Sequence, residues 1–207
     1  MSPADRRRPP ADRLTGDTVS VTGTELWVVR HGETEWSRDG RHTSRTELPL
    51  TDVGVAAAKS LGARLAGATF DRVLTSPRQR ARETARLAGF PEATEVDELS
   101  EWDYGEYEGI TTAQIRETVP GWTVWTHPSP GGEAAADVSA RLDRLINAVR
   151  GSTGDVLVFG HSHTLRGLAA RWIGEPVTDG RSFKLDTATI GVLGYERETP
   201  VVTRWNC

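Results

Sequence analysis

The sequence predicts an α/β protein, a three-layer α/β/α sandwich with a largely parallel central sheet. Two observations favour this class. Short apolar runs typical of buried strands alternate with longer segments whose apolar residues recur at helical spacing. Two of the apolar runs, in VVRHG and VFGHS, end abruptly in a histidine. Polar residues at the carboxyl ends of parallel strands are where sites form in such sheets.

Length and composition are those of one globular unit. With 207 residues, 37% apolar and 26% charged, we expect a single domain over residues 24–207. Residues 1–23 are rich in Pro, Arg and Asp, so we expect a disordered tail there. No apolar stretch reaches the roughly 18 residues of a membrane span, and no secretory signal pattern is present. We therefore expect a cytoplasmic protein that does not bind membranes.

Charge and cysteine content exclude two further classes. The net charge of −4 gives no reason to expect nucleic acid as a partner. Cys207 is the single cysteine, so no internal disulfide can form. Because the chain as a whole is acidic, any site that binds an anion has to be formed by a few neighbouring cationic side chains.

The first strand and first helix are the clearest elements. Residues 25–30 form an apolar run that predicts a buried strand. Residues 51–67 predict a helix, because Thr51 or Asp52 can cap its start and Gly67 ends it.

The next pair repeats this alternation. Residues 70–76 predict a short buried strand. Residues 76–90 predict a helix, with Pro77 in the first turn, where proline is tolerated, and Gly89 near its end. Residues 94–99 favour another short strand.

The second half continues the pattern around one irregular segment. Helices are expected at 111–119, 132–150 and 164–174, and strands within 155–163, 181–186, 188–197 and 201–205. Residues 100–109 form an irregular aromatic and acidic stretch, and residues 120–132 a loop. From that loop Trp122 and Trp125 could cover the site.

Three strand ends carry polar chemistry. They are Arg30 with His31, residues 76–80, and His161. Since the carboxyl ends of parallel strands meet at one edge, we expect two imidazoles and two arginines near one crevice. A neutral imidazole can attack phosphorus, and neighbouring guanidinium groups favour that form and bind phosphate oxygens. With a carboxylic acid as proton donor, such a set transfers phosphate without a metal.

Five ordered blocks carry a family resemblance: VRHGETEW, GRHTSRTELPLTDVG, LTSPRQRARETA, LSEWDYGEYEG and VFGHSHTLRGLAARWIG. Together they resemble the histidine phosphatase superfamily, in its phosphoglycerate-mutase-like branch. The residues within these blocks resemble actinobacterial acid phosphatases and fungal sedoheptulose-bisphosphatase-like members more than the glycolytic mutase.

The resemblance implies a role for five residues. His31 is similar to the nucleophile that becomes phosphohistidine, and Arg30 and Arg80 to the arginines that hold the phosphate. His161 is similar to the second histidine, which donates to phosphate oxygens, and Glu101 to the general acid and base. Three other carboxyl groups of the same block compete for that last role: Asp103, Glu106 and Glu108.

Five further residues are expected to contact the substrate. Ser37 stands where many members have Asn, and Ser44 and Ser162 stand where glycine is usual. A glycine that needs a positive φ or a close approach of phosphate would make these changes affect turnover. Thr43 and His163 complete the expected substrate-contacting set.

His161 and His163 form an HxH pair that could instead bind a metal ion. No third ligand with suitable spacing is evident, since His42 and His127 lie in other loops. We therefore expect no metal and no cofactor.

The sequence thus predicts a phosphomonoesterase acting on a small phosphorylated metabolite, a sugar phosphate or bisphosphate, through phospho-His31. Two alternatives stay open: a cofactor-dependent phosphoglycerate mutase, and a phospho-ligand binding protein with weak turnover. The oligomeric state also stays open, a homodimer included, as does the physiological substrate.

Overall fold

The computed structural model describes residues 23–207, so the tail predicted for residues 1–23 lies almost wholly outside the described part. The strands are β1 (Leu26–Arg30), β2 (Arg72–Thr75), β3 (Thr94–Glu95), β4 (Val156–Gly160), β5 (Ile190–Glu196) and β6 (Thr199–Arg204). The α-helices are α1 (Glu35–Asp39), α2 (Asp52–Leu65), α3 (Gln79–Leu87), α4 (Thr112–Thr118), α5 (Ala135–Arg150) and α6 (Ser162–Trp172). Three short 3₁₀ turns are η1 (Asp97–Leu99), η2 (Gly105–Tyr107) and η3 (Val177–Ser182).

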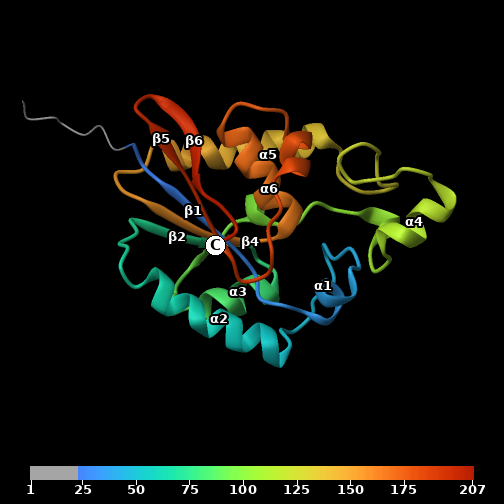
Figure 1. The fold of residues 1–207 in the computed structure, drawn as a ribbon, viewed down its shortest axis with the longest axis horizontal. Coiled ribbons are helices and arrows are strands. Elements are labelled where there is room, and N and C mark those ends of the chain that lie inside the picture. Colours follow the sequence, from blue (N-terminus) through green and yellow to red (C-terminus); the bar gives the residue numbers. More distant parts are fainter. Residues whose placement is uncertain (1–22) are drawn as a thin grey trace, which may run out of the picture.

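The six strands form one sheet in the order β3-β2-β4-β1-β5-β6. β1, β2, β3 and β4 run parallel, and β5 and β6 are antiparallel additions at one side. Helices α2 and α3 cover one face of the sheet, and α5 and α6 cover the other (Figure 1). The predicted three-layer fold with a largely parallel sheet is therefore confirmed.

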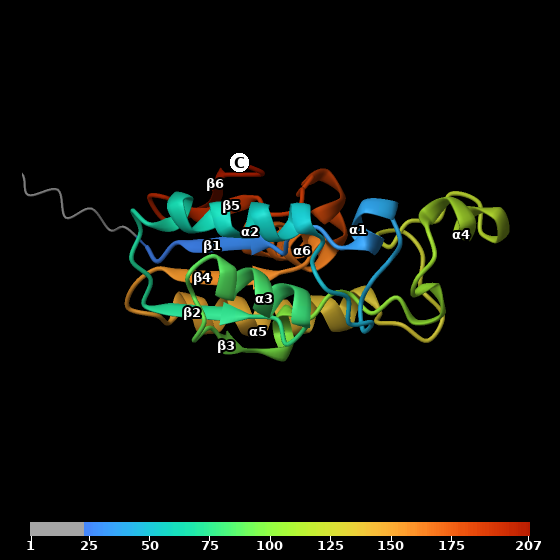
Figure 2. The ribbon, with the colours of Figure 1, turned by 90° about the horizontal axis from the view of Figure 1, so that it is seen from below.

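Each face of the sheet has its own apolar core. Strand residues such as Val28 and Val158 pack with α5 and α6, whose Leu142 belongs to the same buried cluster. On the opposite face, Val29 packs in a second cluster with α2 and α3. Figure 2 looks onto the face covered by α2 and α3, which lie in front of the strands. Burying a single side chain of this kind stabilises the fold by about 1.5–3 kcal/mol. Packing on both faces therefore holds the strands in position.

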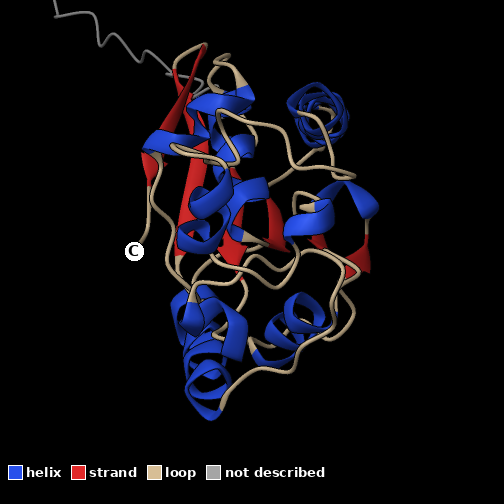
Figure 3. Cartoon of the chain, turned by 90° about the vertical axis from the view of Figure 1, so that its right-hand side faces the viewer, coloured by secondary structure: helices blue, strands red, loops and turns tan. Residues whose placement is uncertain are grey.

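Strand register brings the expected site residues together. Arg30 of β1 pairs with Gly160 of β4, so His31 and His161 follow at the same level of the sheet. On the other side of β4, Thr75 pairs with Phe159, which sets Ser76 beside the same strand end. α1 and α4 lie beyond these carboxyl ends, and Figure 3 views the molecule from that side.

The prediction of a strand at residues 181–186 was wrong. The segment ends the 3₁₀ turn η3 and continues as a loop to β5. Its backbone is satisfied by side chains rather than by a strand ladder: Asn206 Oδ1 accepts from the Asp186 amide at 2.7 Å, and the Leu185 carbonyl accepts from Arg30 at 2.6 Å. The short helix α1 was not predicted.

Of the helices in residues 23–207, none has the length and apolar character needed to cross a bilayer.

Candidate active site

A cavity of about 250 Å³ opens at the carboxyl ends of β1 and β4. Its walls are predominantly polar and come from the strand ends, the loop after α1, the irregular segment before η2 and the start of α6. The lining residues are Arg30, His31, Ser37, Gly40, Arg41, His42, Thr43, Glu101, Tyr104, Thr112, Ser162 and His163. Seven of the ten residues predicted for the site line this cavity, and Arg80, His161 and Ser44 lie behind its wall.

His31 is held in one orientation by the backbone. Its Nδ1 lies 2.7 Å from the Gly32 carbonyl oxygen, an acceptor, so Nδ1 carries the proton and Nε2 presents a lone pair. The Gly32 peptide is itself held, because its amide donates to the Thr84 hydroxyl at 3.0 Å. It also packs closely on α2, where a side chain at position 32 would meet the Gly54 carbonyl oxygen at 2.6 Å. Burial, and then Arg80 and Arg30, hold the pKa of His31 well below its ordinary value. His31 is therefore a neutral, aimed nucleophile.

His161 is oriented in the opposite sense. Arg80 Nε donates to His161 Nδ1 at 3.1 Å, and His161 Nε2 lies 2.8 Å from the Ser76 hydroxyl. The rings of His31 and His161 lie 5.1 Å apart, centre to centre. Burial, followed by the charge of Arg80, lowers the pKa of His161 well below its ordinary value. The two expected imidazoles thus share one site: His31 presents a lone pair, and His161 donates its N–H to Ser76 and accepts from Arg80.

Arg80 is fully buried and held by the loop that precedes α2. Its guanidinium group donates to the carbonyl oxygens of Thr43, Ser44 and Thr46 at 3.1–3.2 Å, in addition to His161. Four of its five N–H groups are used in this way. Arg80 thus builds the back wall of the cavity and keeps one N–H that these four bonds do not use.

Arg30 is anchored at one end and open at the other. Its Nη1 donates to the Leu185 carbonyl oxygen at 2.6 Å. Its Nε is buried and has no hydrogen-bond partner among the described residues. An unpaired buried guanidinium N–H beside a nucleophile is costly unless an anion completes it. The arrangement fits a phosphate oxygen at this point.

Glu101 sits against the start of helix α6. Its Oε1 accepts from the amides of Trp102 and Thr164 at 2.9 and 2.8 Å, and its Oε2 accepts from the His163 amide at 3.1 Å. A carboxylate is favoured at a helix N-terminus, where amide groups are unpaired. Oε2 has one amide partner where Oε1 has two, so Oε2 is the oxygen with more capacity for a further hydrogen bond.

The competing carboxyl groups serve other purposes. Glu108 accepts from the backbone amides of Ser44 and Thr46 at 2.9–3.0 Å, and Asp103 pairs with Arg45. Neither Asp103, Glu106 nor Glu108 lines the cavity. Among the residues 23–207, Glu101 is the carboxyl group that faces it.

One wall of the cavity consists of aromatic and imidazole rings. The Tyr104 hydroxyl and His163 Nδ1 lie 2.5 Å apart, and the ring of His42 lies 4.7 Å from that of Tyr104. Behind His163, Trp125 lies at 5.1 Å, covered by the guanidinium group of Arg166 at 4.9 Å. Burial raises the pKa of Tyr104 well above its ordinary value, so the phenol stays protonated.

The three serines of interest have different positions. Ser37 lines the cavity, and its hydroxyl also caps the start of α1. Ser162 lines the cavity as the first residue of α6, and it does not have the positive φ that would call for glycine. Ser44 lies behind the wall, where its amide and hydroxyl bind Glu108. Thr43 lines the cavity beside Arg41.

Sequence reasoning assigned no role in the site to four lining residues: Gly40, Arg41, His42 and Thr112. The first three stand inside one of the ordered blocks, so their place in that block was the available signal. Thr112 gave none, because its contact with His42 Nε2 at 3.2 Å joins a loop to the start of α4, 70 residues away.

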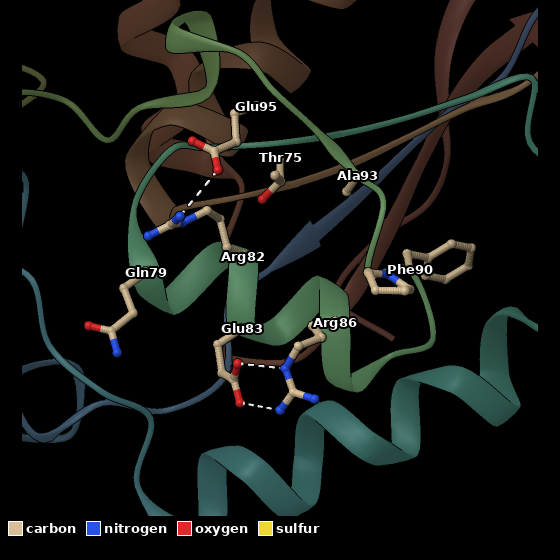
Figure 4. Close-up of a pocket in the computed structure, with 9 residues that line it drawn as sticks. Thr75, Gln79, Arg82, Glu83, Arg86, Phe90, Ala93 and Glu95 are labelled. Carbon is tan, nitrogen blue, oxygen red and sulfur yellow. Dashed lines mark hydrogen bonds and ion pairs between the residues drawn. The ribbon is translucent and has the colours of Figure 1, made fainter.

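A second hollow, of about 310 Å³, lies on the outer side of α3 and is separate from the site (Figure 4). Its charged side chains satisfy one another, since Arg82 pairs with Glu95 at 3.2 Å and Arg86 with Glu83 at 2.7 Å. Within the described part of the chain, no three His, Cys, Asp or Glu side chains are arranged to hold a metal ion.

Comparison with known proteins gives consistent results. The family model of the histidine phosphatase superfamily (branch 1) matches residues 26–207. The chain is 43% identical over 182 residues to an acid phosphatase of Mycobacterium tuberculosis, covering 86% of this chain and 90% of the relative. It is 34% identical over 180 residues to sedoheptulose 1,7-bisphosphatase of Saccharomyces cerevisiae, covering 71% of this chain and 66% of the relative.

Solved structures show the same fold. A protein encoded by an open reading frame of Mycobacterium tuberculosis superposes with a TM-score of 0.85 at 42% identity, covering 88% of this chain and 97% of that one. A protein described as a putative alpha-ribazole-5'-P phosphatase from Escherichia coli superposes with a TM-score of 0.78 at 28% identity, covering 89% and 97%.

Proposed function

The chain belongs to the histidine phosphatase superfamily and is a phosphatase, and we propose that it hydrolyses small, polar phosphate monoesters through a phosphohistidine formed on His31. The observation that carries this proposal is a neutral His31 that presents the lone pair of Nε2 at the cavity, with His161 5.1 Å away and Arg30 and Arg80 beside it.

In the first step, His31 Nε2 attacks phosphorus and the ester P–O bond breaks. Arg30 and Arg80 donate to the phosphoryl oxygens, which carry the developing charge, and His161 holds Arg80 in place by accepting from its Nε. Glu101 gives a proton to the leaving alkoxide. The products of this half-reaction are the free alcohol and phospho-His31.

In the second step, water attacks phosphorus and the P–N bond to His31 breaks. Glu101, now ionised, takes the proton from that water, which returns the carboxyl group to its starting form. The sum of both steps is an alcohol and inorganic phosphate. No group outside the chain, substrate and water is needed.

The cavity supports a small polyol as the alcohol part. Its volume of about 250 Å³ suits a compact metabolite, and Ser37, Thr43, Thr112 and the ring of His42 offer hydroxyl and imidazole groups to a sugar. Arg41 lies at the mouth as an exposed cation. The named activities of the two relatives, acid phosphatase and sedoheptulose 1,7-bisphosphatase, agree with a sugar phosphate or bisphosphate.

Phosphate release from a panel tests this proposal. The purified chain is incubated with sugar phosphates and bisphosphates, a nucleotide, p-nitrophenyl phosphate, and 3-phosphoglycerate with and without 2,3-bisphosphoglycerate. We expect free phosphate from the sugar esters, and acid-labile phosphate on the wild-type chain after rapid quenching. His31→Ala should abolish both signals.

Three results would argue differently. Isomer exchange of 3-phosphoglycerate without phosphate release would favour a mutase. Binding of esters without turnover would favour a phospho-ligand binding protein. Turnover that survives His31→Ala would remove the phosphohistidine from the mechanism.

A further inference from the structure

The hydrogen bonds of His161 leave one assignment for its protons. Arg80 Nε can only donate, and it lies 3.1 Å from His161 Nδ1, so Nδ1 must be the unprotonated nitrogen. A neutral imidazole then carries its proton on Nε2. The group 2.8 Å from Nε2 is the Ser76 hydroxyl, which must therefore accept.

Ser76 is itself held in place, which makes it a fixed acceptor. Its amide donates to the Phe159 carbonyl oxygen at 2.9 Å and so continues the β2–β4 ladder past the last strand residue. Its hydroxyl also accepts from the Arg78 amide at 3.3 Å. The residue is fully buried. Water therefore has no ready access to replace this hydroxyl.

Ser76 and Arg80 each form a hydrogen bond with one of the two ring nitrogens of His161. A ring bound at one nitrogen can pivot about that bond, whereas a ring bound at both is fixed in its plane. The groups around a reacting phosphate have to keep their places, since a misplacement of about 1 Å can cost about a hundredfold in rate. Ser76 therefore sets the orientation of the His161 ring, and with it the position of Arg80 Nε, which donates to that ring.

We propose that Ser76 is a positioning residue that accepts the Nε2–H of His161 and so fixes this ring beside His31 with its Nδ1 toward Arg80. The inference rests on the proposed function, in which Arg80 donates to the phosphoryl oxygens. It adds a residue that touches neither phosphate nor nucleophile.

The test combines kinetics with NMR of the histidine ring nitrogens. In ¹⁵N-histidine-labelled wild-type chain without substrate, His161 should show a protonated Nε2, an unprotonated Nδ1 and a slowly exchanging, downfield Nε2–H proton. In Ser76→Ala, that proton should move upfield or broaden away. With the best ester of the panel, kcat should fall about tenfold to a hundredfold and KM should change less than about threefold.

Two more variants separate this role from packing. Ser76→Cys fills the space but offers sulfur, a weak acceptor, so kcat should stay low and the Nε2–H signal should stay perturbed. Ser60→Ala removes a hydroxyl on the exposed side of α2, where it donates to the Ala57 carbonyl oxygen, and should leave both readouts unchanged. The thermal midpoint of every variant is measured to confirm folding.

Three outcomes would overturn the proposal. They are an Nδ1-protonated His161 in the wild type, wild-type kcat in Ser76→Ala, or restored kcat in Ser76→Cys, which would assign the loss to a cavity. The NMR result on the free chain is independent of turnover. A failure of the phosphohistidine mechanism therefore shows in the His31→Ala assay and not in the ring signals.

Discussion

His31 owes its neutral form to its surroundings. Burial comes first among the causes that lower its pKa, and Arg80 and Arg30 follow. A base whose pKa is lowered stays unprotonated to lower pH than a free histidine, so the nucleophile survives in acid. We predict that kcat/KM, corrected for the ionisation of the substrate, shows no acidic limb near pH 6.5. The pH profile from pH 4.5 to 8 checks this, and a loss of activity centred near 6.5 would contradict it.

Thr84 supports His31 from behind. Its hydroxyl accepts from the Gly32 amide at 3.0 Å and donates to the Arg80 carbonyl oxygen at 2.7 Å. The same Gly32 peptide holds His31 Nδ1 through its carbonyl oxygen. Thr84→Val keeps the shape but leaves a buried amide unpaired, at a cost of about 1–3 kcal/mol.

We predict that Thr84→Val lowers the free energy of unfolding by that amount and reduces kcat. Chemical denaturation and steady-state kinetics measure the two effects. Thr84→Ser keeps the hydroxyl and should restore most of kcat. If Val and Ser behaved alike, the Thr84 hydroxyl would have no role in orienting the peptide.

At the scale of elements, helix α6 presents its first turn to the site and Glu101 closes that turn. In Glu101→Gln the amide oxygen can still accept from the backbone, but no proton can be delivered. Loss of a general acid costs about 10²- to 10⁴-fold in rate. A leaving group that departs as a stable anion has little need of that proton.

We therefore predict that Glu101→Gln reduces kcat strongly for alkyl and sugar phosphates and much less for p-nitrophenyl phosphate. Steady-state kcat for the two ester classes measures the difference. The matched control is Glu106→Gln, since Glu106 lies outside the cavity lining. An equal loss on both ester classes in Glu101→Gln would mean that this carboxyl group holds the substrate or the helix and delivers no proton.

The sequence could predict an element where local rules decide its structure, and it could not where hydrogen-bond partners from distant parts of the chain decide it. The strand ending at His31 was predictable, because apolar runs and parallel topology are local and general rules. The loop at 181–186 was not, because its backbone is satisfied by Arg30 and Asn206 from distant parts of the chain. Alternating apolar residues there resemble a strand until those partners are known.

The sequence could predict the catalytic side chains of the site, but it could not predict the residues that hold these side chains in place. His31, Arg30 and Glu101 stand in recognisable blocks. That Ser76 meets His161 follows only from the pairing of Thr75 with Phe159 in the sheet. A one-residue change in that register would turn the hydroxyl to the opposite face.

At the scale of the whole molecule, the buried histidines couple folding to pH. Burial is the first cause that lowers the pKa of His31, His42, His161 and His163. The unfolded chain then binds more protons than the folded one below about pH 6.5, the ordinary value for histidine. Stability is therefore full above that pH and declines as pH falls toward the lowered folded values.

We predict a lower thermal midpoint at pH 5 than at pH 7, with a slope of up to about 1.4 kcal/mol per pH unit for each such histidine. Carboxyl groups also contribute to this difference, so a matched variant is needed. His163→Gln removes one titrating group and should reduce the difference between the two midpoints. An unchanged difference in that variant would contradict the assignment.

The domain boundary makes a last prediction for the whole chain. We propose that residues 24–207 form one independently folding domain, because the described contacts that anchor its start lie within that range. The Thr24 hydroxyl donates to the Ser152 carbonyl oxygen at 3.1 Å, and the Glu25 amide donates to Asp155 at 2.9 Å. Removing residues 1–22 leaves both bonds in place.

We therefore expect a chain beginning at residue 23 to keep its thermal midpoint within about 2 °C and its kcat/KM within about twofold. The matched control begins at residue 26 and loses the bonds of Thr24 and Glu25, together with the Glu25 carboxylate that accepts from Trp27 Nε1 at 3.0 Å. Two or three lost bonds at about 1 kcal/mol each should lower its midpoint by about 4–12 °C. Scanning calorimetry of the three chains measures both steps. A large loss already on removal of residues 1–22 would place part of the folding unit in that segment, and the boundary would have to move toward the N-terminus.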